Sequence, residues 1–159
     1  DQKPHGVIGL SRKVHLKMYY IYIFRRLPVM HHTVNENSIS DMVDTFYSRV
    51  RSDDLLGPVF EDAIGSDWIP HLEKMKAFWS SVLLASRTYK GNPMIAHLQL
   101  PRLTGRHFER WLELWAETAA ALCSRELASV FLQRAQMIGD RLLSTISRYH
   151  EAETVVKAS

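Results

Sequence analysis

One histidine of this 159-residue chain is placed where a metal ligand would be useful. His97 lies in a short segment between Pro93 and Pro101, among apolar neighbours. A neutral imidazole in apolar surroundings can coordinate iron through one ring nitrogen, as the proximal ligand of a haem does. A buried or half-exposed histidine with no ligand role fits the same spacing. The residue alone leaves both interpretations open.

A second histidine begins an apolar stripe. His71, Met75, Phe78 and Val82 are spaced at i, i+4, i+7 and i+11, so they share one face of a helix. Stripes of this kind usually pack into a protein core. A core stripe usually begins with an aliphatic residue, however, and the histidine at the head of this one also suits the wall of a cofactor slot.

Tyr47 and Trp111 lie on other segments and are the remaining candidates for chemistry. Each combines a large apolar body with one polar hydrogen, which needs an acceptor when the side chain is buried. A backbone carbonyl or a bound ligand would serve equally well as that acceptor. His97, His71, Tyr47 and Trp111 together therefore raise the hypothesis of a polar site within an apolar pocket.

Helical periodicity predicts the elements that would position these residues. Apolar residues at helical spacing follow Ser38 or Ser40, either of which can cap a helix that stops at Gly57. After a short segment at 59–64, a helix with Pro70 in its first turn runs to about residue 86. A brief helix at 94–100 and two long helices at 105–122 and 125–150 complete the prediction. No strand pattern of useful length is present, so the fold class is predicted to be all-α.

Composition limits the class of protein. The chain is 46% hydrophobic and 23% charged, which is typical of a soluble globular protein, and its length suits one domain. Its single cysteine, Cys123, excludes an intramolecular disulfide and favours a reducing, cytoplasmic setting. No apolar run is long enough to cross a bilayer, and a membrane partner is not expected.

The positive charge is concentrated at the start of the chain. Residues 1–29 carry a net charge of +5, whereas residues 30–159 carry −2, so nucleic-acid binding by the body has little support. We interpret residues 1–33 as an extension, either added sequence or sequence upstream of a natural start at Met30; a membrane-surface anchor is the alternative. Residues 34–152 are the predicted domain, and residues 153–159 are a tail.

The candidate residues and their order along the chain resemble a known family. Phe46-Tyr47, Leu56-Gly57-Pro58-Val59-Phe60, Trp68-Ile69-Pro70-His71, Phe78-Trp79, His97, Phe108-Glu109-Arg110-Trp111-Leu112 and the 132–138 segment LQRAQMI are similar to the truncated, two-on-two haemoglobins of group III. The resemblance covers about residues 35–150. The double-glycine motifs of groups I and II are absent, which agrees with group III, and residues 1–33 have no counterpart in the family.

The resemblance implies a truncated globin fold and a role for each motif residue. His97 would be the proximal ligand of the iron of haem b. Tyr47 and Trp111 would donate hydrogen bonds to a ligand on the distal side, and His71 would gate the pocket or join its polar network. The residues that the resemblance places against the haem are Phe60, Met75, Phe78, Trp79, Leu98 and Ile138.

The expected function is binding of dioxygen, nitric oxide, carbon monoxide or peroxide. Two donors would slow oxygen release, because a hydrogen bond to a charged acceptor contributes about 1.5–3 kcal/mol. Nitric oxide dioxygenation or weak peroxidase activity is an alternative, and either would need an external reductase because no nucleotide-binding glycine motif is present. An alternative of another class is a haem-free helical interaction module.

Overall fold

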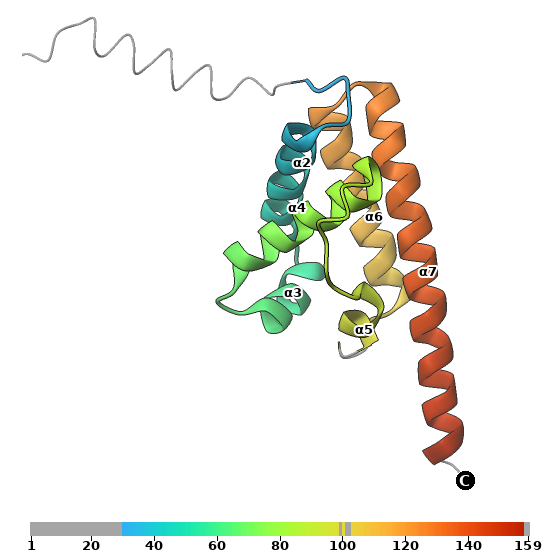
Figure 1. Ribbon diagram of the computed structural model, residues 1–159. Helices are drawn as coiled ribbons and strands as arrows, with labels where there is room; N and C mark the ends of the chain where they lie inside the picture. The colour runs from blue at the N-terminus through green and yellow to red at the C-terminus, as the bar shows by residue number, and fades with distance from the viewer. Residues whose placement is uncertain (1–29, 99, 101–102, 158–159) are drawn as a thin grey trace, which may run out of the picture.

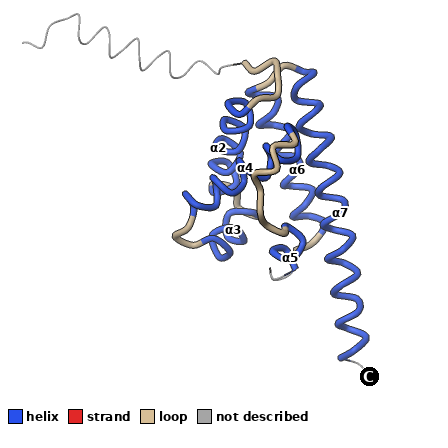
Figure 2. Tube along the Cα trace, in the orientation of Figure 1, coloured by secondary structure: helices blue, strands red, loops and turns tan. Residues whose placement is uncertain are grey.

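The computed structural model describes residues 30–98, 100 and 103–157, and the extension predicted at residues 1–33 lies almost entirely outside this range. Within the described range the regular structure consists of helices joined by loops (Figure 2). They are α2 (Glu36–Arg51), α3 (Leu56–Ile64), α4 (Trp68–Leu84), α5 (Pro93–Leu98), α6 (Gly105–Leu122) and α7 (Arg125–Lys157). The all-α prediction is confirmed.

The four longest helices form two pairs. Helix α2 packs against α4, α6 packs along α7, and α2 also contacts α6, which joins the pairs (Figure 1). The short helix α3 contacts α2 and α6, whereas α5 rests against α7. This is the two-on-two arrangement that the sequence predicted.

An aromatic core holds the two pairs together. Trp115 of α6 is fully buried, and its ring stacks on Trp79 of α4 at 4.4 Å and meets Phe46 of α2 edge-on at 4.9 Å. Its indole N–H donates to the carbonyl of Phe131 in α7 at 3.2 Å. One side chain therefore contacts the three other long helices, with its polar hydrogen satisfied.

The start of α2 differs from the prediction. The cap is Asn35, whose Oδ1 accepts from the backbone N–H of Ser38 at 2.9 Å, while Ser38 Oγ accepts from the N–H of Asn35 at 3.0 Å. Ser38 is thus the third helical residue of a reciprocal capping box, and the prediction of Ser38 or Ser40 as the cap was wrong. The box places the helix start three residues earlier.

The two helices α6 and α7 test the other predicted bounds. The range predicted for α6 is confirmed, and His107 bonds back to Thr104 Oγ1 at 2.8 Å at its first turn. Helix α7 is longer than predicted: it continues to Lys157, through most of the segment interpreted as a tail. No helix within the described residues is both long and apolar enough to span a membrane.

Candidate functional site

His97 is presented by α5, a helix of only six residues. Asn92 begins it, because its Oδ1 accepts from the backbone N–H groups of Met94 at 3.0 Å and Ile95 at 3.3 Å. Met94 and Leu98 then pack against a small apolar cluster formed by Phe108, Leu142 and Ile146. The cap and this packing fix a helix that is too short to be stable alone.

The hydrogen bonding of His97 leaves one ring nitrogen available. Its Nδ1 lies 2.6 Å from the carbonyl oxygen of Pro93, one turn earlier in the same helix, so Nδ1 carries the proton and donates. In the neutral ring the other nitrogen, Nε2, is then the unprotonated one, with its lone pair available to a metal. Histidines that bind metals are commonly held in this way, because the carbonyl sets both the tautomer and the ring orientation.

Tyr47 lies one turn before the end of α2 and is 6% exposed. Its ring makes edge contacts with Phe60 at 5.8 Å, Trp68 at 6.3 Å and His71 at 5.2 Å. Burial raises the pKa of Tyr47 well above its usual value. Its phenol therefore remains protonated at every physiological pH and is able to donate a hydrogen bond.

His71 contains a polar atom that the protein does not satisfy. Its Nε2 is buried and has no hydrogen-bond partner in the described part of the chain. The pKa of His71 is lowered, first by burial and then by the charges of Lys74 and His97. The ring of His71 is therefore neutral near pH 7. A buried nitrogen without a partner is uncommon and suggests a polar ligand.

Trp111 lies on α6 and is half-buried. Its ring stacks on Trp115 at 5.8 Å with an interplanar angle of 14°, and it meets Phe46 edge-on at 5.8 Å. Phe46 also contacts the ring of Tyr47 at 5.1 Å. The two predicted donors are thus linked through Phe46, which lies against both.

Most of the predicted apolar lining shares one type of environment. Phe60, Met75, Phe78, Leu98 and Ile138 are all half-buried and pack on the core, and Ile138 contacts both apolar clusters. Trp79 differs, because it is 2% exposed and stacked on Trp115. Most of its ring surface is therefore covered by the core, and its contact with haem stays a prediction.

A surface groove lies between α2 and α4, beside Tyr47. It encloses about 440 Å³, and Asp44, Ser48, Arg51 and Trp68 contribute to its walls. The guanidinium of Arg51 lies 4.7 Å from the ring centre of Trp68, whose indole N–H donates to Glu61 at 3.0 Å.

Three features of the site had no place in the sequence interpretation. Asn92 caps α5 and Pro93 supplies the acceptor for His97, and neither residue was assigned a role in the site. The spacing of Pro93 and His97 could have indicated this, because the ring of a helical histidine can reach the backbone carbonyl four residues earlier. The third feature, an ion pair beside Trp111, is described below.

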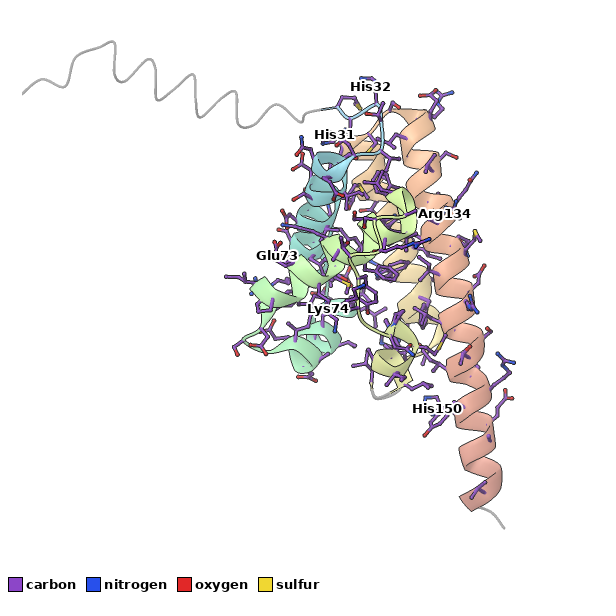
Figure 3. All side chains as sticks on the ribbon, viewed as in Figure 1. His31, His32, Glu73, Lys74, Arg134 and His150 are labelled. Carbon is purple, nitrogen blue, oxygen red and sulfur yellow. The ribbon has the colours of Figure 1, made fainter. Side chains whose placement is uncertain are left out.

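His31 and His32 lie where α6 joins α7, at the opposite end of the molecule from α5 (Figure 3). The backbone of His31 donates to Leu122 at 2.8 Å and accepts from Ser124 at 2.7 Å. Its ring bonds Asp41 at 2.8 Å. These histidines hold the entry to α2 in place and are not part of the site.

Comparison with known proteins agrees with this geometry. The family model described as "Bacterial-like globin" matches residues 33–138. The chain therefore belongs to the bacterial-like globin family, whose members are haem-binding proteins.

Individual relatives identify the branch of the family. The chain is 38% identical over 120 residues to the group 3 truncated hemoglobin ctb of Campylobacter jejuni, an alignment that covers 74% of this chain and 94% of that protein. It is 36% identical over 84 residues to the group 2 truncated hemoglobin YjbI of Bacillus subtilis, covering 50% of this chain and 60% of that protein. The crystal structure of the group III truncated hemoglobin from Campylobacter jejuni matches with a TM-score of 0.70 at 38% identity, covering 74% and 94% of the two chains. The resemblance to group III is confirmed.

Proposed function

We propose that this protein binds haem b through Nε2 of His97 and holds dioxygen or a similar diatomic ligand beside Tyr47, His71 and Trp111. The observation that supports this most strongly is the 2.6 Å hydrogen bond between His97 Nδ1 and the Pro93 carbonyl. It fixes the tautomer and leaves Nε2 as the ligand atom. The iron would supply reversible binding of the diatomic ligand. The side chains of the protein would hold the haem, exclude water and donate hydrogen bonds to the bound ligand.

The predicted apolar lining suits a large apolar cofactor. The half-buried side chains of Phe60, Met75, Phe78, Leu98 and Ile138 offer apolar surface on α3, α4, α5 and α7. Covering such surface contributes roughly 25 cal/mol per Å² removed from water. These side chains would also exclude water, which strengthens every polar interaction inside the pocket.

The polar residues of the pocket would slow ligand release. Tyr47 keeps its proton because burial raises the pKa of the phenol. The indole N–H of Trp111 does not ionise near neutral pH, so it also remains a donor. His71 has a buried, unpartnered nitrogen that a polar ligand or a bridging water would satisfy. Donors fixed in position favour a ligand with negative charge on its outer atom, so we propose tight oxygen binding with slow release.

The proposed setting is cytoplasmic. Burial raises the pKa of the Cys123 thiol to about 11, so this single cysteine remains a protonated, unreactive packing residue. A chain without structural disulfides suits a reducing compartment.

Reconstitution with haem tests the proposal. The purified protein mixed with haemin, reduced and exposed to carbon monoxide, should give a sharp Soret band at one haem per chain. His97→Ala should lose stable haem, and added imidazole should restore the band because it replaces the missing ligand. His32→Ala, which changes an exposed histidine far from the site, should behave as the wild type. Absence of a Soret band in the wild type, or normal haem retention by His97→Ala, would overturn the proposal.

A further inference from the structure

An ion pair beside the distal pocket links three of its helices. Asp53 lies in the turn between α2 and α3, and its Oδ2 accepts from Arg110 Nε of α6 at 2.7 Å. The other oxygen, Oδ1, accepts from the backbone N–H groups of Leu55 at 3.1 Å and Leu56 at 2.9 Å, where α3 begins. One carboxylate thus holds the start of α3 and the side of α6.

Both members of this ion pair lie close in sequence to predicted distal residues. Asp53 follows Tyr47 by less than two helical turns, and Arg110 is adjacent to Trp111. Helix α3, which Asp53 begins, carries Phe60, whose ring contacts Tyr47 at 5.8 Å. A change in the distance between Asp53 and Arg110 would therefore move the helices that carry Tyr47, Phe60 and Trp111 relative to one another.

The surroundings of the pair make it more rigid than an ordinary surface ion pair. The Asp53 side chain is 9% exposed, and that of Arg110 is 33% exposed. Arg110 also donates through Nη1 to Glu113 at 2.9 Å, and Glu117 lies 3.7 Å from the same atom. A guanidinium fixed by several acceptors loses less freedom per hydrogen bond than a lysine would.

We propose that Asp53 and Arg110 are a positioning pair that sets the placement of Tyr47 and Trp111 and so determines how slowly the pocket releases its ligand. The inference rests on the proposed function, because Tyr47 and Trp111 must act as donors for it to hold. Neither Asp53 nor Arg110 is proposed to touch the ligand; both act through the helices that they join. Geometry of this kind matters because hydrogen bonds weaken steeply when they lengthen or bend.

The test uses the haem-loaded protein and a substitution that removes only the ion pair. In Asp53→Asn the amide oxygen can still accept from Leu55 and Leu56, whereas the amide nitrogen cannot accept from Arg110. Arg110→Met removes the other partner. Each variant should release oxygen about three- to tenfold faster than the wild type, the change expected when a hydrogen bond to a charged acceptor is partly lost. The double variant should be no faster than the single variants, because both remove one interaction.

A second measurement separates positioning from general loosening of the fold. The stretching frequency of haem-bound carbon monoxide reports the polar groups near the ligand and should shift in Asp53→Asn and Arg110→Met. The matched control is Glu113→Gln, which neutralises another acceptor of Arg110 and leaves Asp53 in place; its off-rate and frequency should match those of the wild type. Arg110→Lys, which restores the charge and one donor, should recover part of the slow release.

The possible outcomes distinguish this inference from the proposed function. Failure of the wild type to bind haem would remove both. A haem-loaded Asp53→Asn with an unchanged off-rate and unchanged carbon monoxide frequency would overturn the positioning role alone. Additive effects in the double variant, or a Glu113→Gln variant as fast as Asp53→Asn, would also overturn it.

Discussion

Three polar groups of the proposed distal site, those of Tyr47, His71 and Trp111, lie where a hydrocarbon side chain would cost less to bury. Burying a hydroxyl, an indole N–H or an imidazole nitrogen without a partner costs free energy, since each gives up its hydrogen bonds to water. The rings of Tyr47 and Trp111 contact Phe46 and the ring of His71 contacts Tyr47, yet the buried Nε2 of His71 has no partner within the described residues. The cost is understandable if a ligand accepts from these groups.

Tyr47→Phe should separate the donor from its ring. The phenyl ring keeps the contacts with Phe60 and His71, so haem retention should be unchanged. We expect oxygen release about tenfold faster or more, because one hydrogen bond to a charged acceptor is lost. Stopped-flow measurement of oxygen dissociation checks this. Tyr149→Phe, which alters an exposed tyrosine on α7, is the control. An unchanged rate in Tyr47→Phe would remove Tyr47 from its proposed role.

Asp53 should make stability depend on pH. Burial acts to raise the pKa of Asp53, but the N–H of Leu56, the Arg110 hydrogen bond, the N–H of Leu55 and the charge of Arg110 together lower it below its usual value. A lowered folded-state pKa stabilises the native protein above the unfolded-state pKa of about 3.9, and this contribution disappears as pH falls through the folded-state pKa.

Urea unfolding of Asp53→Asn measures this contribution. The variant should unfold at lower urea than the wild type at pH 7, and the difference should shrink as the pH is lowered below about 4, where the wild-type carboxylate also loses its charge. Asp54→Asn, at an exposed neighbouring position, should show no such pattern. A difference between wild type and Asp53→Asn that grew in acid would contradict this assignment.

At the scale of elements, α5 is the least self-sufficient part of the site. Its six residues complete few backbone hydrogen bonds of their own, and it rests mainly on α7, with Phe108 of α6 completing the apolar cluster beneath it (Figure 1). Its stability therefore depends on the Asn92 cap and on the packing of Met94 and Leu98. The orientation of His97 is only as stable as this short helix.

Removing the cap of α5 should weaken haem retention. Asn92→Ala loses both bonds to the backbone of α5, at a cost of about 1 kcal/mol. Haem transfer to an apoglobin acceptor should be about fivefold faster, whereas Asn92→Asp, which keeps an acceptor, should remain near the wild-type rate. Asn35→Ala removes the comparable cap of α2, away from His97, and should lower stability without speeding haem loss. Equal haem loss in the two alanine variants would contradict a specific role for Asn92.

The sequence was informative about elements whose signals are local. Apolar periodicity and the reciprocal contact between Thr104 and His107 define α6, and its bounds were predicted correctly. The cap of α2 was not, because Ser38 and Asn35 each suit the position and only the backbone geometry decides between them. The pairing of Asp53 with Arg110 joins residues far apart in the chain, so no local pattern could predict it. Likewise, no spacing rule indicates that Trp79 stacks in the core rather than facing the pocket.

For the whole molecule, we expect the core around the stacked Trp79 and Trp115 to resist local opening most strongly, and α5 to resist it least. Trp115 contacts three other helices and has its N–H satisfied, so the centre of the fold should open only on global unfolding. The half-buried residues around His97 should be stabilised mainly by the cofactor. A ligand that binds only the folded state adds stability in proportion to the logarithm of its concentration over its dissociation constant.

Amide hydrogen exchange with and without haem should reveal this difference. In the haem-free protein we expect residues 93–98 to exchange quickly and the central residues of α6 to exchange slowly. Haem should protect α5 by at least tenfold and change α6 little. Mass spectrometry of peptic peptides resolves the two segments. Uniform protection of both would indicate that haem stabilises the fold as a whole rather than α5.

The backbone hydrogen bonds of His31 to Leu122 and Ser124 determine where a group attached near residue 30 would lie. Two hydrogen bonds fix this residue to the α6–α7 junction, at the end of the molecule away from α5. A fluorophore, an affinity handle or a second domain joined just ahead of residue 30 would therefore meet the body on the side remote from His97. The protein could therefore be immobilised by this end with the side that carries His97 facing the solution.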